Sequence, residues 1–153
     1  MTPAVKLLIK QKIAHKTHEY QHEANAASYG IEAAEKLLVP PSRVFKTLVI
    51  ESESALAVTV VPVTHQLSLK LAAKALKTKK TQMAPAKKVE SSTGYVLGGV
   101  SPLGQKKRLT TLIDNSADTF DTIFISGGKR GLEIEIAASD LQTLCNATFC
   151  QLT

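Results

Sequence analysis

Cysteine is scarce in this sequence, and long apolar runs are absent. The only two cysteines, Cys145 and Cys150, lie close together at a spacing that fits neither a zinc knuckle nor a redox pair. No stretch is long and apolar enough to cross a bilayer. Residues 1–12 carry charges and no long apolar run, so we expect no signal peptide. These absences predict a reduced, cytoplasmic protein that has no membrane-spanning segment.

Acidic residues are nearly missing from one third of the chain. Between Thr64 and Arg108 the only acid is Glu90, and the formal net charge of the whole chain is +6. The basic residues of this segment are Lys70, Lys74, Lys77, Lys79, Lys80, Lys87, Lys88, Lys106, Lys107 and Arg108. Such a surface would attract a polyanion and bind its phosphates in a salt-dependent way. On charge alone, an RNA-binding face and a lysine-rich solvated face both remain open.

The composition is that of an ordinary globular protein, with 44% apolar and 21% charged residues among 153. A chain of this length matches one domain, which removes roughly 70% of its unfolded surface from water. Neither a linker nor an internal repeat interrupts it. We therefore expect a single domain over residues 1–153.

Short helical and short β patterns follow one another without regular alternation. Helical spacing is found at 3–12, from Ser28 or Gly30 to Leu38, at 68–77, from Pro85 onward and at 139–145. Runs rich in β-branched or apolar residues, or extended in pattern, are found at 16–20, 44–50, 56–63, near Thr81, and at 109–113, 122–125, 132–136 and 148–152. This order predicts an α+β fold with a mixed, largely antiparallel sheet and flanking helices.

Some details of these helices can be predicted as well. Ser68 and Ser139 are expected to cap the helices that follow them. In the second helix Leu38 is expected to face inward together with Ala33, Ala34 and Leu37. In the helix after Ser68, the lysines at 70, 74 and 77 share the face opposite the apolar stripe.

Lys46 is a charged residue on an otherwise apolar strand face. In a strand over 44–50, its side chain points to the same face as Val44, Leu48 and Ile50. If that face lines a pocket, the ammonium is partly desolvated and suited to hold an anionic or carbonyl oxygen. A lysine that extends to water from a sheet edge is the alternative on this pattern alone.

Two glycine-rich segments, 98–104 and 126–131, each have basic residues within them or just after them. Glycines let the backbone approach a ligand closely and present N–H groups to an oxyanion, while lysine and arginine suit phosphate. Two ordinary tight turns are the alternative interpretation.

His18, Glu19 and His22 match the H-E-x-x-H pattern of zinc peptidases. The pattern binds zinc only on a helix, where the two histidines converge on one metal. Residues 16–20 have an extended pattern and no apolar stripe, which would separate the histidines along a strand. No serine or cysteine lies in a G-x-S-x-G turn, so no protein nucleophile is evident. Cys145 is expected to face the core.

Four segments together closely resemble the YbaK family of aminoacyl-tRNA deacylases. They are FKTL at 45–48, STGY at 92–95, GGVSPLGQKKR at 98–108 and SGGKRGL at 126–132. The similarity spans nearly the whole chain. It implies a barrel-like mixed sheet with flanking helices, related to the editing domain of bacterial prolyl-tRNA synthetases. It also implies a substrate, cysteine wrongly esterified to tRNA(Pro), and no cofactor.

The resemblance assigns roles to particular residues. Lys46 would be the catalytic residue, in contact with the 3′-terminal nucleotide or the ester. The substrate-binding residues would be Tyr20, Gly98, Gly99, Ser126, Gly127 and Glu133. Relatives carry Asp where this chain has Glu133, and their loop corresponding to 51–54 is longer. For tRNA contact we expect Lys106, Lys107, Arg108 and Lys129, with Lys70, Lys74 and Lys77 as outer steering charges.

The family mechanism suits a protein without a nucleophile of its own. In it the thiol of the substrate cysteine attacks its own ester carbonyl and the amino acid leaves as a cyclic thiolactone. An intramolecular attack by an oriented group reaches an effective molarity of roughly 10⁵ to 10⁸ M. Two other functions remain open on the sequence: a non-catalytic tRNA-binding factor of prolyl-tRNA synthetase, and a zinc peptidase built on His18 and His22.

Overall fold

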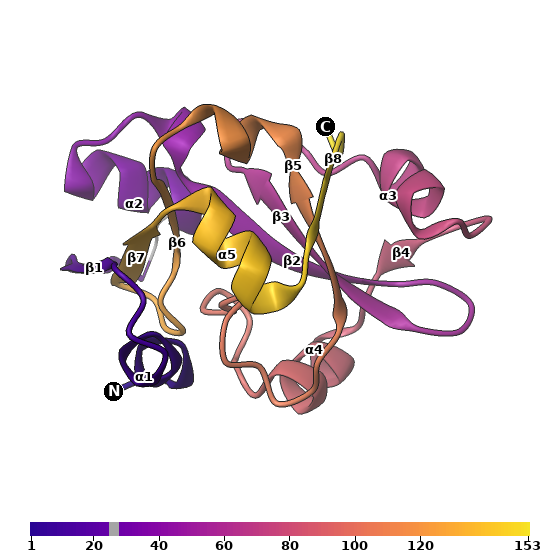
Figure 1. The fold of residues 1–153 in the computed structure, drawn as a ribbon, viewed down its shortest axis with the longest axis horizontal. Coiled ribbons are helices and arrows are strands. Elements are labelled where there is room, and N and C mark those ends of the chain that lie inside the picture. Colours follow the sequence, from indigo (N-terminus) through magenta and orange to yellow (C-terminus); the bar gives the residue numbers. More distant parts are fainter. Residues whose placement is uncertain (25–27) are drawn as a thin grey trace.

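Two β-sheets joined at one point form the centre of the molecule (Figure 1). The computed structural model describes residues 1–24 and 28–153. Its strands are β1 (Lys16–Glu19), β2 (Phe45–Glu51), β3 (Leu56–Pro62), β4 (Gln82–Met83), β5 (Thr110–Asp114), β6 (Ile123–Ser126), β7 (Leu132–Ile136) and β8 (Thr148–Cys150). One sheet has the order β4-β2-β3-β5-β8 and the other has the order β1-β7-β6. A parallel bridge between Val44 and Phe124 links them.

Most strand pairs are antiparallel. β2 pairs with β3 and β4 in this way, and β7 pairs with β1 and β6 in this way. The pairs β3–β5 and β5–β8 are parallel. The predicted mixed, largely antiparallel α+β architecture is therefore confirmed, with the strands divided between two linked sheets.

The helices are short and surround the sheets. They are α1 (Pro3–Lys10), α2 (Tyr29–Leu37), α3 (Leu69–Leu76), α4 (Ala86–Thr93) and α5 (Ala138–Cys145), with 3-10 turns η1 (Pro41–Arg43) and η2 (Asn115–Thr119). As predicted, Ser68 caps α3, because its hydroxyl accepts a hydrogen bond from the Leu71 N–H at 3.1 Å. The prediction that Ser139 caps the last helix is wrong. α5 begins at Ala138, so Ala137 occupies the N-cap position and makes no side-chain hydrogen bond there.

Leu38 corrects a second expectation. It was predicted to face inward, but its side chain is 91% exposed. Leu38 is the C-cap of α2 and has a left-handed backbone with φ of 58°. The helix therefore ends at Leu37, and the left-handed turn directs the Leu38 side chain away from the apolar face. Of the four predicted residues, Ala33, Ala34 and Leu37 pack inward.

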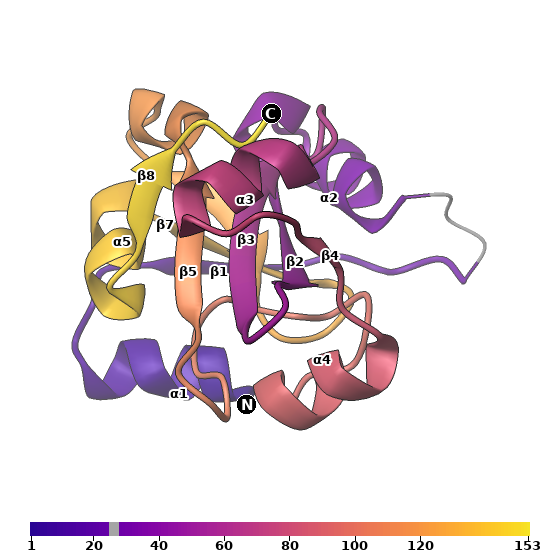
Figure 2. The ribbon, with the colours of Figure 1, turned by 90° about the vertical axis from the view of Figure 1, so that its right-hand side faces the viewer.

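The apolar residues form a main core and two smaller clusters. The main core joins β2, β3, β5, β6 and β7 to α1, α4 and α5. A second cluster lies under α3, which crosses in front of β3 and β5 in Figure 2. A third cluster holds α2 against Val44 and Phe124, where the two sheets meet. No helix in the described part of the chain is long and apolar enough to cross a membrane.

Candidate functional site

A cleft of about 320 Å³ opens beside the junction of the two sheets. Helix α2, strand β2, the loop at 97–100 and the ends of β1, β6 and β7 surround it. It is lined by Tyr20, Ser28, Tyr29, Gly30, Phe45, Lys46, Thr47, Leu48, Val63, Leu97, Gly98, Val100, Ser126, Arg130 and Glu133. Residues from six separate segments therefore converge on one cavity.

The cleft exists because β2 has a gap along one edge. β6 meets this edge only at the Val44–Phe124 bridge, and β4 pairs with it only from Ile50 onward. The Val49 carbonyl points to this edge, since it accepts the N–H of Ala84 at 3.1 Å. Backbone groups alternate in direction along a strand, so the Thr47 N–H also points to this edge. It lies in the gap and can donate a hydrogen bond into the cleft.

Lys46 lies at this gap with its side chain half-buried. Burial lowers the pKa of its ammonium group, because a charged group loses hydration there. Among the residues that the structure describes, no carboxylate lies within ion-pair distance of Lys46. The side chain is thus an unneutralised, partly desolvated cation next to an open cavity.

Glu133 is the buried acid of the cleft. Its side chain is only 7% exposed, and burial raises its pKa from 4.5 to about 8. In the sheet register it lies opposite Ser126 on β6 and His18 on β1. Burial also raises the pKa of the nearby Tyr20 hydroxyl, and the charge of Glu133 adds to this effect. The free protein therefore holds Glu133 largely protonated at neutral pH.

Two buried side-chain oxygens lack a hydrogen-bond partner within residues 1–24 and 28–153, and both belong to residues that line this cleft. They are the Oε2 atom of Glu133 and the Oγ1 atom of Thr47. Buried polar atoms are nearly always hydrogen-bonded in folded proteins. Two exceptions at one cavity indicate a place where a polar ligand completes the hydrogen bonds.

The structure brings five of the predicted pocket residues together: Tyr20, Lys46, Gly98, Ser126 and Glu133 all line the cleft. Gly99 and Gly127 do not line it. A Cβ atom at Gly99 would lie 2.9 Å from the Lys129 backbone, and one at Gly127 would lie 2.5 Å from the Leu132 side chain. The absence of a side chain at these two glycines allows close packing in the segments that contain Gly98 and Ser126.

Sequence reasoning missed Thr47, Tyr29 and Arg130. Thr47 follows Lys46 directly, and a strand pattern assigns the two side chains to opposite faces. Thr47 lines the cleft all the same, and its N–H lies in the gap along β2. The sequence predicted a role for Lys129 but not for Arg130, although only Arg130 of the two lines the cleft. Both are basic residues in the same glycine-rich segment, so the sequence could not show which of them faces the cleft.

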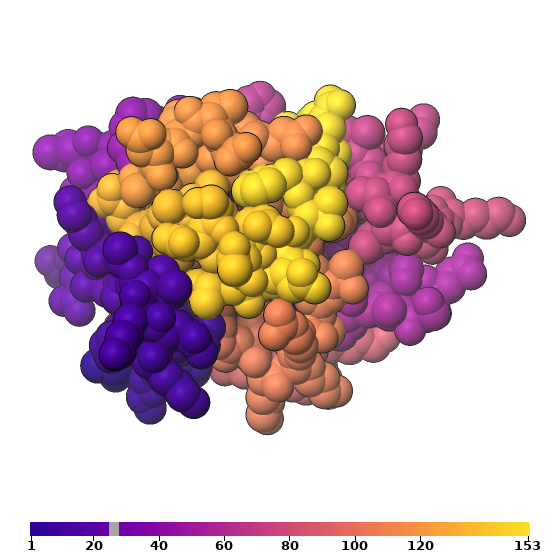
Figure 3. Space-filling model, viewed as in Figure 1, coloured from indigo at the N-terminus to yellow at the C-terminus, as the bar shows by residue number. Residues whose placement is uncertain are grey.

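Two of the four predicted RNA-contacting cations lie at a second cleft, of about 480 Å³, between α1, α5 and the segment 102–109. Figure 3 shows the face on which α1 and α5 lie side by side. Lys107 and Arg108 line this second cleft, and Lys106 and Lys129 are exposed. Cys145 lies in its wall, partly buried against the main core, and donates its S–H to the Pro102 carbonyl at 3.4 Å.

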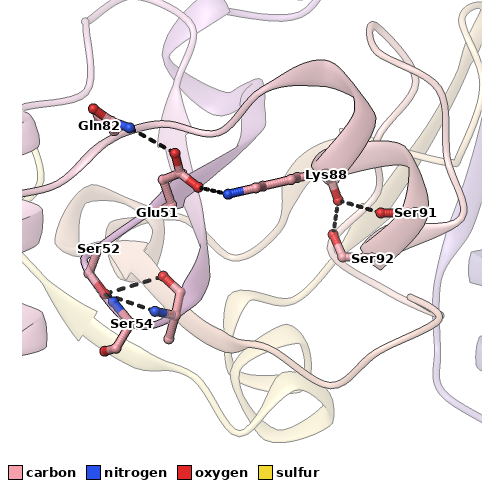
Figure 4. A network of polar contacts seen from close by, with 8 residues as sticks. Glu51, Ser52, Ser54, Gln82, Lys88, Ser91 and Ser92 are labelled. Atoms are coloured by element: carbon pink, nitrogen blue, oxygen red, sulfur yellow. Dashed lines mark hydrogen bonds and ion pairs between the residues drawn. The ribbon is translucent and has the colours of Figure 1, made fainter.

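The other lysines of the basic segment are arranged differently. Helix α3, with Lys70, Lys74 and Lys77 exposed, lies at the opposite end of the long axis from α2 (Figure 1). Lys88 is not a free cation, because its ammonium lies 2.8 Å from the Glu51 carboxylate (Figure 4). Glu51 also accepts a hydrogen bond from Gln82, which ties α4 and β4 to the end of β2.

The H-E-x-x-H segment is extended, as predicted, and does not form the helix that the zinc motif needs. His18 is in β1 and its Nε2 atom lies 2.9 Å from Glu135, whereas the Nδ1 atom of His22 lies 2.7 Å from Glu32. Each histidine is thus paired with a different carboxylate. In the described residues, no group of three or more His, Cys, Asp or Glu side chains is arranged to hold a metal ion.

Comparison with solved structures defines the fold class. A structure described as a trans-editing enzyme for prolyl-tRNA synthetase superposes with a TM-score of 0.87 at 20% identity, covering 100% of this chain and 98% of the other. A hypothetical protein superposes with a TM-score of 0.88 at 19% identity, covering 99% of each chain. At these identities the likeness shows the fold alone.

Sequence comparison then identifies the family. The family model of the aminoacyl-tRNA editing domain matches residues 23–144. The chain is also 35% identical, over 153 residues, to an Enterococcus faecalis protein named as the Cys-tRNA(Pro)/Cys-tRNA(Cys) deacylase EbsC; the match covers 99% of this chain and 93% of that protein. The chain belongs to the aminoacyl-tRNA editing domain family.

Proposed function

We propose that this chain, as one editing domain over residues 1–153, is a trans-editing deacylase that releases cysteine from mischarged Cys-tRNA(Pro). The observation that carries the proposal is the pair of unpartnered buried oxygens, on Thr47 and Glu133, in the same cleft as the cation of Lys46. Family membership and the name of the Enterococcus relative support the substrate class.

Three polar residues of the cleft match parts of an aminoacyl ester. Glu133 suits the substrate ammonium, because a nearby cation favours the ionised carboxylate that burial opposes. The Lys46 ammonium and the Thr47 N–H suit the oxygen on which negative charge develops when the ester carbonyl is attacked. The Thr47 hydroxyl, buried without a partner, would hydrogen-bond to the aminoacyl group or the ribose.

The chemical step needs no nucleophile from the protein. The thiol sulfur of the substrate attacks the ester carbonyl carbon, and the bond from that carbon to the ribose oxygen breaks. The ribose oxygen takes up the proton that the thiol gives up, and the amino acid leaves as a thiolactone that water later opens. Holding the thiol near the carbonyl supplies most of the acceleration, since the attack is intramolecular. The protein folds the substrate and stabilises the oxyanion.

We propose that the reaction takes place in the cytoplasm, where tRNA is charged, and that prolyl-tRNA synthetase assists in selecting the tRNA. The basic residues that support tRNA contact are Lys106, Lys107, Arg108 and Lys129. The cleft itself is too small to enclose more than the end of an RNA strand. Recognition of the rest of the tRNA must therefore use the outer surface or a partner.

A deacylation panel tests the proposal. Wild type, Lys46→Ala and the exposed-lysine control Lys70→Ala are each incubated with tRNA(Pro) carrying cysteine, serine, alanine or proline. We expect wild type and the control to release cysteine fastest. Lys46→Ala should be slower by at least about 100-fold, as for loss of an oxyanion-stabilising group.

The serine ester isolates the thiol mechanism, because it replaces the attacking sulfur by a hydroxyl. Rapid release of serine would contradict cyclisation by the thiol. Absence of any release by wild type, together with tight tRNA binding, would instead indicate an RNA-binding factor without catalysis.

A further inference from the structure

Arg130 lines the cleft although it is an exposed residue, which places it at the cleft mouth. Its guanidinium carbon lies 3.8 Å from the centre of the Tyr29 ring, a cation–π contact. On another side it packs against Gly98, where a Cβ atom would lie 2.5 Å from the Arg130 Nε atom. Tyr29 and Gly98 thus hold the guanidinium at the cleft mouth.

No residue in the described part of the chain uses the hydrogen-bond donors of this guanidinium. Within the described residues, no group accepts a hydrogen bond from Arg130 and no carboxylate lies within 4.0 Å of it. Nearby acids do not neutralise it either. Glu32 is hydrogen-bonded to His22, and no ion pair joins Glu32 or Glu133 to Arg130 within residues 1–24 and 28–153.

Arg43 provides an internal comparison. It also lies over an aromatic ring, with its guanidinium carbon 5.0 Å from the centre of Phe124. Its donors, however, are used by the Thr122 carbonyl and hydroxyl at 2.6 to 3.1 Å, and its charge is met by Glu135. Arg43 thus has a structural role. Arg130 also lies over an aromatic ring, but no described residue accepts a hydrogen bond from its guanidinium.

A fixed, unpaired guanidinium matches a phosphodiester, whose two free oxygens accept parallel N–H bonds. In the proposed function the ester carbonyl lies near Lys46 and Thr47 inside the cleft. The 5′ phosphate of the same nucleotide is then one ribose further out, at the mouth. We propose that Arg130 binds this terminal phosphodiester and that Tyr29 and Gly98 position it. This inference rests on the proposed function and assigns its RNA-anchoring residue.

Two substrates separate this role from a structural one. The first is a cysteinylated RNA hairpin with a single-stranded 3′ end, and the second is 3′-O-cysteinyl adenosine, which has no phosphate. On the RNA, we expect Arg130→Ala to lower kcat/KM by about 10- to 100-fold, the effect of losing a hydrogen bond to a charged group. On the nucleoside ester, the same variant should stay within about twofold of wild type.

Conservative variants sharpen the test. Arg130→Lys should lose most of the RNA effect, because an ammonium cannot donate two parallel bonds. Tyr29→Phe should retain the stacking and the rate, whereas Tyr29→Leu should lose part of the rate on RNA only. Lys16→Ala is the control, because Lys16 is an exposed cation on β1 that neither lines the cleft nor is assigned to tRNA contact.

The outcomes are distinguishable. Equal losses on both substrates, or no loss on the RNA, would overturn the role of Arg130. If wild type cleaves neither ester, the proposed function fails. Titration of the uncharged hairpin then still tests Arg130, since its Ala variant should bind more weakly by about tenfold or more.

Discussion

Glu133 and Lys46 face one cleft, and burial shifts both toward their neutral forms. Burial raises the pKa of the Glu133 carboxyl and lowers that of the Lys46 ammonium. Each would gain from a ligand of opposite charge, because such a ligand stabilises the charged form that burial opposes. An amino acid ester offers both, an ammonium group and an oxygen that becomes negative. The same two residues should therefore carry a measurable stability cost in the free protein.

This cost gives a prediction at the residue scale. The folded state binds the Glu133 proton more tightly than the unfolded state, so stability should fall as pH rises from about 4.5 to about 8. In the Glu133→Gln variant residue 133 cannot ionise, so its unfolding free energy should fall less than that of wild type between pH 5 and 8, by roughly 3 kcal/mol. Urea denaturation at a series of pH values measures the unfolding free energy of both proteins.

Glu135 supplies the control for that measurement. A hydrogen bond from Thr122 lowers the pKa of its carboxyl, so Glu135 is ionised throughout the range. Glu135→Gln should leave the fall between pH 5 and 8 in place. A wild-type stability that is flat over this range would show that Glu133 is not buried as a neutral acid.

Among the elements, β2 matters most, because its gap forms the site. Its outer edge is paired at both ends, by β6 and by β4, and open between them. The salt bridge between Glu51 and Lys88 fixes the β4 end of this edge to α4 (Figure 4). The open stretch is thus framed by paired segments, which keeps Lys46 and Thr47 in a regular strand.

Helix capping allows a prediction at the element scale. Ser68→Ala removes the hydroxyl that caps α3 and should cost about 1 kcal/mol of unfolding free energy. Ser139 was expected to have the same role but is not an N-cap, so Ser139→Ala should stay within about 0.5 kcal/mol of wild type. Chemical denaturation of both variants measures the difference. Equal losses in the two would contradict the observed start of α5.

At the scale of the whole molecule, the positive charge is divided between two regions. Lys107 and Arg108 belong to the segment that continues from the loop lining the cleft. Helix α3, which carries the other lysines, lies at the opposite end of the long axis from α2 (Figure 1). Under the proposed function, we expect the first region to contact an RNA whose 3′ end is in the cleft and the second to act over a longer range.

Salt dependence separates these two regions. Lys107→Gln and Arg108→Gln should each reduce the slope of log K against log salt for tRNA binding by about 0.7 to 0.9, the value for one phosphate contact. Lys74→Gln on α3 should leave the slope nearly unchanged. If all three variants changed the slope equally, tRNA would bind without a preferred region.

Local pattern in the sequence was sufficient for much of this protein. Alternating and helical periodicity placed nearly all helices and strands within a few residues, and identified Lys46 as a charge on an apolar strand face. Such features depend on residues that are close together in the sequence, so a single sequence is enough to recognise them. The four motif segments were likewise sufficient to indicate the editing family.

Only the tertiary structure decided which residues meet at the cleft. Gly98 lines it and Gly99 does not, and Arg130 lines it and Lys129 does not. Thr47 lines it together with its neighbour Lys46, although side chains alternate along a strand. These outcomes depend on where the contact between β6 and β2 ends and where the pairing of β4 with β2 begins. Both contacts join segments that are far apart in the chain. Burial of Glu133 has the same origin, because a carboxyl on a strand is desolvated only when other parts of the chain cover it.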